Sequence, residues 1–143
     1  MMATYKAITK TNHFHVTDAE KLKDIVSRMH CNSKVTLVED EQGKNTYTIW
    51  AYSDIQGVYT DENSPSDIAG PDFGLLTAEL QTILPEGEAL ILFELGTESL
   101  RYLTATATIV TRNEVKQIDL VNDAFNMARE ILGNPTWETQ IDN

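Results

Sequence analysis

The chain has 143 residues, enough for one domain with a buried core. Its composition, 41% hydrophobic and 23% charged, is too apolar for a disordered chain, and no apolar run approaches the roughly 18 residues of a membrane span. The first residues lack the apolar stretch of a secretory signal, and the single Cys31 excludes an internal disulfide. We therefore expect a cytoplasmic protein without membrane contact.

The net charge of −11 is concentrated in one segment. Between Asn45 and Leu100 there is no Lys, Arg or His, and this segment holds ten acids. The rest of the chain has twelve acids against eleven Lys plus Arg, so it is nearly neutral. Direct binding to nucleic acid is disfavoured, because phosphate affinity comes largely from Lys and Arg. A basic or DNA-binding protein is the partner that such a charge favours.

The N-terminal part predicts a strand followed by a helix. Residues 6–16 alternate partly, as in a strand. In "TDAEKLKDIVSRMH", Thr17 is placed to cap a helix, with Glu20 three residues later completing a capping box. The apolar residues that follow at helical spacing are Leu22, Ile25, Val26 and Met29.

A β-hairpin is expected next. "KVTLVED" and "TYTIWAYS" are rich in β-branched and aromatic residues, and "EQGKN" between them supplies turn residues. "QGVYT" is expected to continue the same sheet after a bulge or turn at Gly57. The aromatic residues Trp50, Tyr52, Tyr59 and Trp137 are interpreted as packing residues, or as protein-binding anchors if they are exposed together.

The second half predicts a helix, three strands and a last helix. "FGLLTAELQTILP" places Leu76, Leu80, Ile83 and Leu84 on one face and ends at Pro85. "EALILFELGT" is nearly all apolar, which is typical of a central strand buried on both faces. "LRYLTATATIVTRN" and "EVKQIDL" form the next two strands, joined near Asn113.

The last helix is bounded by an Asp119 cap and by Gly133. Its expected inward face consists of Val121, Ala124, Phe125, Ala128, Ile131 and Leu132. The whole pattern predicts a single α+β domain over residues 1–143, with residues 134–143 as a C-terminal tail. Its core is a mainly antiparallel sheet of about five or six strands with three helices.

Three stretches, "KTNHFHVTDAEKL", "LPEGEALILFELGTESLRYLTATATIVT" and "ILGNPTWET", resemble a group of small accessory proteins. These proteins are carried on conjugative elements, plasmids and prophages of Gram-positive bacteria. The resemblance spans most of the chain but includes no catalytic motif. It implies a genetic setting on a mobile element and no functional residue.

The candidate binding residues are the acids in and near the loop "YTDENSPSDIAGPDFG": Asp54, Asp61, Glu62, Asp67 and Asp72. One hypothesis is that they imitate the negative charge of DNA and inhibit a host DNA-binding or defence protein. The plainer alternative is a solvated acidic surface. A calcium loop is disfavoured, because "DENSPSDIAGPD" has Pro and Ser where the EF-hand pattern needs a ligand and Gly.

The sequence gives less support to a metal site or to catalysis, and no cofactor or metal is expected. His13, His15, His30 and Cys31 could be combined into a zinc site, but nothing in their spacing brings the two pairs together. No nucleophile motif or phosphate-binding glycine loop is present, and Glu94, Glu98 and Arg101 are explained equally well by an ion pair. We therefore expect a non-enzymatic binding protein. The alternatives are an interaction module or homo-oligomer that uses an apolar patch and, less favoured, a small enzyme.

Overall fold

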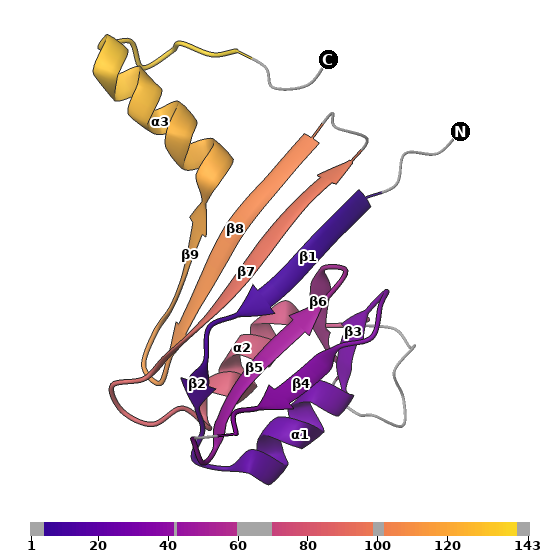
Figure 1. Ribbon diagram of the computed structural model, residues 1–143. Helices are drawn as coiled ribbons and strands as arrows, with labels where there is room; N and C mark the ends of the chain where they lie inside the picture. The colour runs from indigo at the N-terminus through magenta and orange to yellow at the C-terminus, as the bar shows by residue number, and fades with distance from the viewer. Residues whose placement is uncertain (1–4, 42, 60–69, 99–101, 140–143) are drawn as a thin grey trace.

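The structure, a computed structural model, describes residues 5–41, 43–59, 70–98 and 102–139. Within these residues the chain forms nine strands and three helices, which confirms the expected α+β class (Figure 1). The strands are β1 (Tyr5–Thr11), β2 (Phe14–His15), β3 (Met29–Cys31), β4 (Thr36–Glu39), β5 (Thr46–Ala51), β6 (Ile55–Val58), β7 (Ala89–Glu98), β8 (Tyr102–Thr111) and β9 (Val115–Asp119). The helices are α1 (Ala19–Ser27), α2 (Phe73–Gln81) and α3 (Leu120–Leu132). None of these helices is long and apolar enough to cross a membrane.

The main sheet is antiparallel and follows the order β2-β5-β1-β7-β8-β9, with β4 also paired to β5. The hairpins predicted around residues 40–45 and 112–114 are both present. The expected continuation of this sheet after Gly57 is wrong, because β6 pairs with β3 in a separate two-stranded sheet. Gly57, at φ 139°, lets the backbone of Asp72 approach so closely that a Cβ would overlap it.

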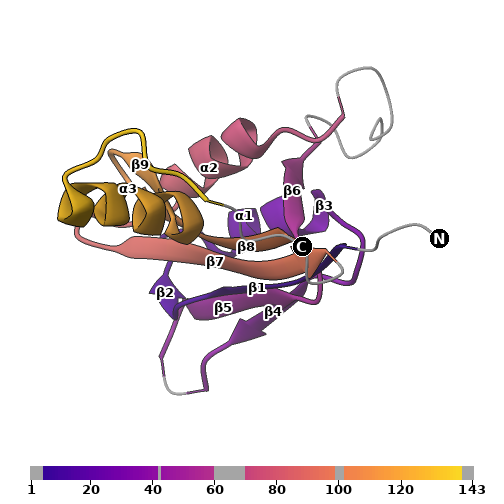
Figure 2. The same cartoon turned by 90° about the horizontal axis from the view of Figure 1, so that it is seen from above.

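The core lies between one face of the sheet and helices α1 and α2, which cover that face together (Figure 2). Leu76 and Leu80 of α2 are buried, as are Ile83 and Leu84 just beyond its end, so the expected apolar face of this segment is confirmed. The other core residues include Phe14, Val16, Leu22, Ile25, Tyr47, Ile49, Ile55, Val58, Leu90, Leu92 and Val110.

The helix caps follow the expected chemistry with one change. Asp18, not Thr17, caps α1, and its carboxylate accepts a hydrogen bond from the Lys21 N–H at 3.0 Å. The Thr17 hydroxyl instead donates to the Ile83 carbonyl, which ties the start of α1 to the end of the α2 segment. Asp119 caps α3 as predicted, and Gly133 ends it in the left-handed conformation.

The predicted inward face of α3 is wrong. No residue of this helix is buried, and Ile131 is 83% exposed. Figure 1 shows why: α3 follows the end of β9 and lies apart from α1 and α2, so it does not reach the core. Part of the tail folds back on it, because the Trp137 ring packs edge-on against Phe125 and its carbonyl accepts from Arg129 at 2.8 Å.

Candidate functional site

Strand β7 has one buried face and one exposed face. Leu90 and Leu92 point into the core, whereas Phe93 and Leu95 on the opposite face are 45% and 59% exposed. The prediction that this strand is buried on both faces is therefore wrong. The physical reason is that α1 and α2 cover the same side of the sheet, and no described helix covers the other side (Figure 2).

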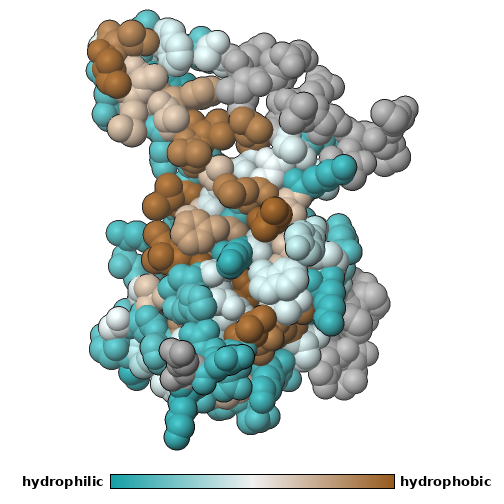
Figure 3. Space-filling model, in the orientation of Figure 1, coloured by the Kyte–Doolittle hydropathy of each residue, from teal (hydrophilic) through white to brown (hydrophobic). Residues whose placement is uncertain are grey.

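The uncovered side carries an apolar surface, which we call the open face. It is formed by the outward side chains of β1, β7, β8 and β9. Strand pairing places Ile8 opposite Leu95, and Ala107 between Phe93 and Ile118. The large residues of this surface are 45% to 59% exposed and comprise Ile8, Phe93, Leu95, Leu103 and Ile118. Figure 3 shows this side of the molecule, with hydrophobic residues running across the strands.

The charge of the open face differs in sign from that of the whole chain. Lys6 and Lys10 of β1 and Lys116 of β9 share the parity of Ile8 and Ile118, so their side chains project from the same face. Lys116 also makes an exposed ion pair with Glu114 at 3.5 Å. At the described outward positions of these four strands there is no Asp or Glu. The open face is therefore apolar with a basic rim, in a chain of net charge −11.

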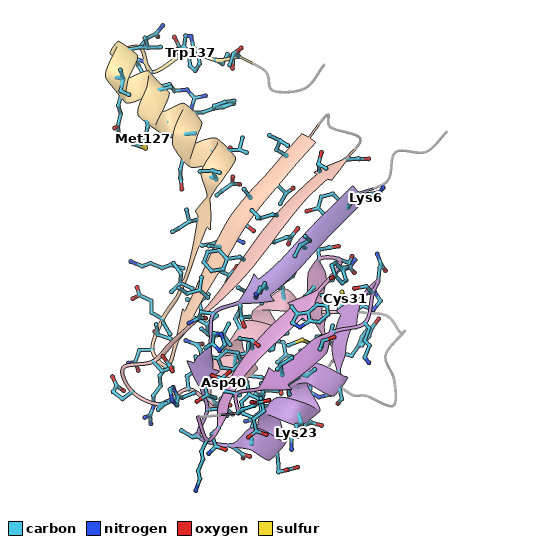
Figure 4. All side chains as sticks on the ribbon, viewed as in Figure 1. Lys6, Lys23, Cys31, Asp40, Met127 and Trp137 are labelled. Atoms are coloured by element: carbon cyan, nitrogen blue, oxygen red, sulfur yellow. The ribbon has the colours of Figure 1, made fainter. Side chains whose placement is uncertain are left out.

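Helix α3 adds a second exposed apolar surface, which we call the α3 stripe. It consists of Leu120, Ala124, Met127 and Ile131, spaced at helical intervals and all exposed. Phe125, which contacts Trp137, lies on a different side of the helix from Met127. In Figure 3 hydrophobic residues appear both on α3 and on the strands, and Figure 4 labels Met127 of the α3 stripe in the same orientation.

Two of the five acids predicted to bind a partner lie in the described part of the chain. Asp72 is exposed and caps α2 by accepting from the Leu75 N–H at 3.0 Å. Asp54 is half-buried in the connection between β5 and β6 and accepts from the Ser53 hydroxyl. Asp61, Glu62 and Asp67 lie outside the described residues. The acidic patch therefore stays a prediction.

Several acids of the Asn45–Leu100 segment have partners within the fold. Glu79 of α2 binds the Arg28 guanidinium at 2.5 Å. Glu88 accepts from both the backbone N–H and the imidazole of His15, at 2.8 and 2.9 Å. Folding thus brings positive and polar groups from the N-terminal part to carboxylates that have no basic neighbour in the sequence.

The residues considered for zinc have separate partners. His15 binds Glu88, His13 binds Asp40 at 2.9 Å, and His30 binds the Tyr59 hydroxyl at 2.8 Å. The Cys31 thiol lies 3.7 Å from the Ser33 hydroxyl. Within the described ranges no three His, Cys, Asp or Glu side chains are grouped so that they could hold a metal ion.

One polar cavity, on the core side of the sheet, is a rival candidate site because it contains Glu94. Its volume is about 230 Å³, and Glu94, Thr106 and Gln117 are among its lining residues. Glu94 accepts a short hydrogen bond from the Tyr5 hydroxyl, and burial together with this bond raises the pKa of Tyr5 to about 12. Because small-molecule sites usually measure roughly 300–1,000 Å³, this cavity is a weaker candidate than the open face. Arg101, considered with Glu94, lies outside the described residues.

Comparison with known proteins identified no family model, curated protein or solved structure that matches this chain.

Proposed function

We propose that the chain is a non-enzymatic protein-binding module whose binding surface is the open face. The observation that carries this proposal is the half exposure of five large apolar side chains on adjacent strands. Burying apolar surface contributes roughly 25 cal/mol per Å². A partner that covers these side chains would therefore gain binding free energy from removing them from water. Contiguous apolar surface of this kind, rimmed by polar groups, is typical of protein interaction sites.

The rim of the open face indicates the chemistry of its partner. Its positive charges favour a protein segment that presents apolar side chains flanked by carboxylates. These charges belong to Lys6, Lys10 and Lys116. A basic segment would place like charges together as it docked. The open face is therefore proposed to bind an acidic amphipathic segment of a protein.

The acidic loop is a different surface and supports a different proposal. Asp54 and Asp72 lie in connections outside β1, β7, β8 and β9, so they are not part of the open face. Inhibition of a DNA-binding protein through these acids, and an origin on a mobile element, remain predictions from the sequence. The two proposals require partners of opposite charge, which makes them separable by experiment.

A pair of synthetic peptides tests the proposed binding surface. One is an amphipathic helix with Glu on its polar side, and its twin has Lys in place of each Glu. Fluorescence polarisation with the labelled peptides should show that the acidic peptide binds at least about tenfold more tightly than its twin. Equal affinity for both, or tighter binding of the basic twin, would contradict the proposed chemistry.

Variants of the chain locate the binding. Phe93→Ser with Leu95→Ser removes two large apolar contacts and should weaken binding of the acidic peptide by about tenfold or more. Val115→Ser is the matched control, because Val115 is exposed on the opposite face of β9. If both variants bind the peptide as the unmodified chain does, the open face is not the binding surface.

A further inference from the structure

We propose that a second copy of this chain is the partner of the open face, and that the α3 stripe of each copy packs on the open face of the other. This inference rests on the proposed function, because it names the partner of that same surface. The assembly is a two-fold symmetric dimer with two equivalent helix-on-sheet contacts.

The first argument is charge complementarity. Asp123 lies four residues before Met127, and Glu130 lies three residues after it, so both carboxylates border the α3 stripe. The α3 stripe is thus an apolar surface with an acidic border. The open face is an apolar surface with a rim formed by Lys6, Lys10 and Lys116. The chain therefore contains both halves of the contact, with opposite charges.

The second argument is the amount of apolar surface. The open face and the α3 stripe together expose eight large apolar side chains, between 45% and 83% exposed: Ile8, Phe93, Leu95, Leu103, Ile118, Leu120, Met127 and Ile131. At roughly 100 Å² for each, they offer on the order of 800 Å², about what one partner buries in a standard interface.

The third argument is geometric. A symmetric dimer requires that the same surface of each copy contain both contacting parts. Figure 3 shows hydrophobic residues on α3 as well as on the strands, and Figure 4, viewed from the same side, labels Met127 of the α3 stripe, which agrees with this condition. Figure 4 places Met127 on α3 at one end of the molecule and Lys6 at the start of β1, so the two parts are separate enough to contact different regions of a second copy.

The test is complementation between two variants, measured as molecular mass by analytical ultracentrifugation. The stripe variant, Met127→Asp with Ile131→Asp, keeps an intact open face. The face variant, Phe93→Ser with Leu95→Ser, keeps an intact α3 stripe. We expect the unmodified chain to be a dimer and each variant alone to be a monomer at the same concentration. An equimolar mixture should form a heterodimer, because one of its two contacts joins an intact stripe to an intact face.

Each other outcome overturns the inference. A monomeric unmodified chain shows that no second copy binds, and a face variant that stays dimeric shows that the dimer uses another surface. If the stripe variant stays dimeric while the face variant is a monomer, the open face is an interface but α3 does not cover it. A mixture that stays monomeric, although both variants keep the circular dichroism spectrum and melting temperature of folded protein, also excludes the reciprocal contact.

Failure of the inference is distinguishable from failure of the proposed function. The acidic peptide can be titrated into the stripe variant, whose open face no partner helix can occupy. Binding of the peptide to this variant supports the proposed function whatever the mass measurements show. Absence of peptide binding there contradicts the proposed function itself.

Discussion

Arg28, at the end of α1, forms a two-pronged ion pair with Glu79 of α2, 51 residues away in the chain. Both terminal nitrogens of the guanidinium donate to separate oxygens of the carboxylate, and one of them also donates to the Tyr59 carbonyl. The Arg28 side chain is only 9% exposed. This pair joins the two helices that cover the core and neutralises one carboxylate of the acidic segment.

Replacing Arg28 with Met should destabilise the fold. The variant leaves the Glu79 carboxylate largely buried without its partner, and removing one member of a buried pair costs roughly 3–5 kcal/mol. Because Glu79 is 22% exposed, we expect a smaller loss of about 2–3 kcal/mol in the free energy of unfolding, measured with urea. The double variant Arg28→Met/Glu79→Leu should recover much of this loss, since the less exposed of the two carboxylates that Arg28 binds is removed with it, and the other, Asp24, is 55% exposed to water. If the two substitutions destabilise additively, the pair is not coupled as described.

Tyr5 should make the folded state sensitive to alkaline pH. Burial and the hydrogen bond to Glu94 raise the pKa of Tyr5 to about 12, so the folded protein holds this proton more tightly than the unfolded chain does. The resulting stability is complete below the unfolded pKa of about 10 and is lost as the pH rises towards 12. Tyr5→Phe should flatten this part of the stability profile, measured by urea unfolding between pH 9 and pH 12.

The control for this prediction is Tyr52→Phe, because Tyr52 is 70% exposed in the bend that follows β5. An absorbance titration of the tyrosines should lose a group that titrates near pH 12 in the Tyr5→Phe variant only. A profile that changes equally in both variants would contradict the assignment to Tyr5.

Glu88 should make the stability of the folded state sensitive to acidic pH, in contrast to the alkaline sensitivity that Tyr5 produces. Burial raises the pKa of this carboxyl, but hydrogen bonds from the backbone and side chain of His15 outweigh it and leave the pKa below its ordinary value. The folded state therefore releases this proton more readily, so the stability is present above the unfolded pKa and is lost as the pH falls through the folded pKa.

Glu88→Gln should consequently reduce stability near neutral pH and lose less on acidification than the unmodified chain. Urea unfolding at pH 7 and at pH 3 measures the difference. Glu20→Gln is the control, because the Glu20 side chain is 87% exposed. Identical acid sensitivity of the two variants would show that the contacts between His15 and Glu88 do not stabilise the fold.

Local signals in the sequence predict much of the fold. The alternation in residues 34–53 and the turn residues between its two halves predict the β4–β5 hairpin, because strand pairing there involves neighbours in the chain. Asp119 and Gly133 predict both ends of α3, because caps act within one helical turn. Where two residues compete for one cap, as Thr17 and Asp18 do, the choice depends on a distant contact, here with Ile83.

The candidate site could not be predicted in the same way. The apolar pattern of β7 shows that both of its faces favour burial, but not whether this chain supplies a layer for each face. The periodicity of α3 likewise identifies an apolar side without saying what covers it. Only the fold shows that α1 and α2 lie on one side and leave Phe93 and Leu95 exposed on the other. The ion pair between Glu79 and Arg28 could not be predicted either, because Arg28 lies in a distant part of the sequence.

Charge reversal provides a last prediction for the proposed dimer. Lys6→Glu with Lys10→Glu should weaken association, because these residues would then face Asp123 and Glu130 of the partner helix with like charge. Asp123→Lys with Glu130→Lys should weaken it in the same way. Exposed ion pairs contribute about 0.2–1 kcal/mol each, and a symmetric dimer repeats every contact, so we expect about tenfold to a hundredfold weaker dimerisation. Combining all four substitutions restores opposite charges across the contact and should recover most of the affinity.

Matched controls separate these local contacts from the repulsion between two chains of net charge −11. The control variant Lys23→Glu with Lys44→Glu changes the net charge as much as the variant at Lys6 and Lys10 does. Lys23 and Lys44 are exposed and lie outside the open face. Glu20→Lys with Glu41→Lys matches the α3 variant. Sedimentation equilibrium should show that the controls change the dimer dissociation constant much less than the variants of the two surfaces. If the controls weaken the dimer equally, or the fourfold variant fails to recover affinity, the lysine rim does not face α3.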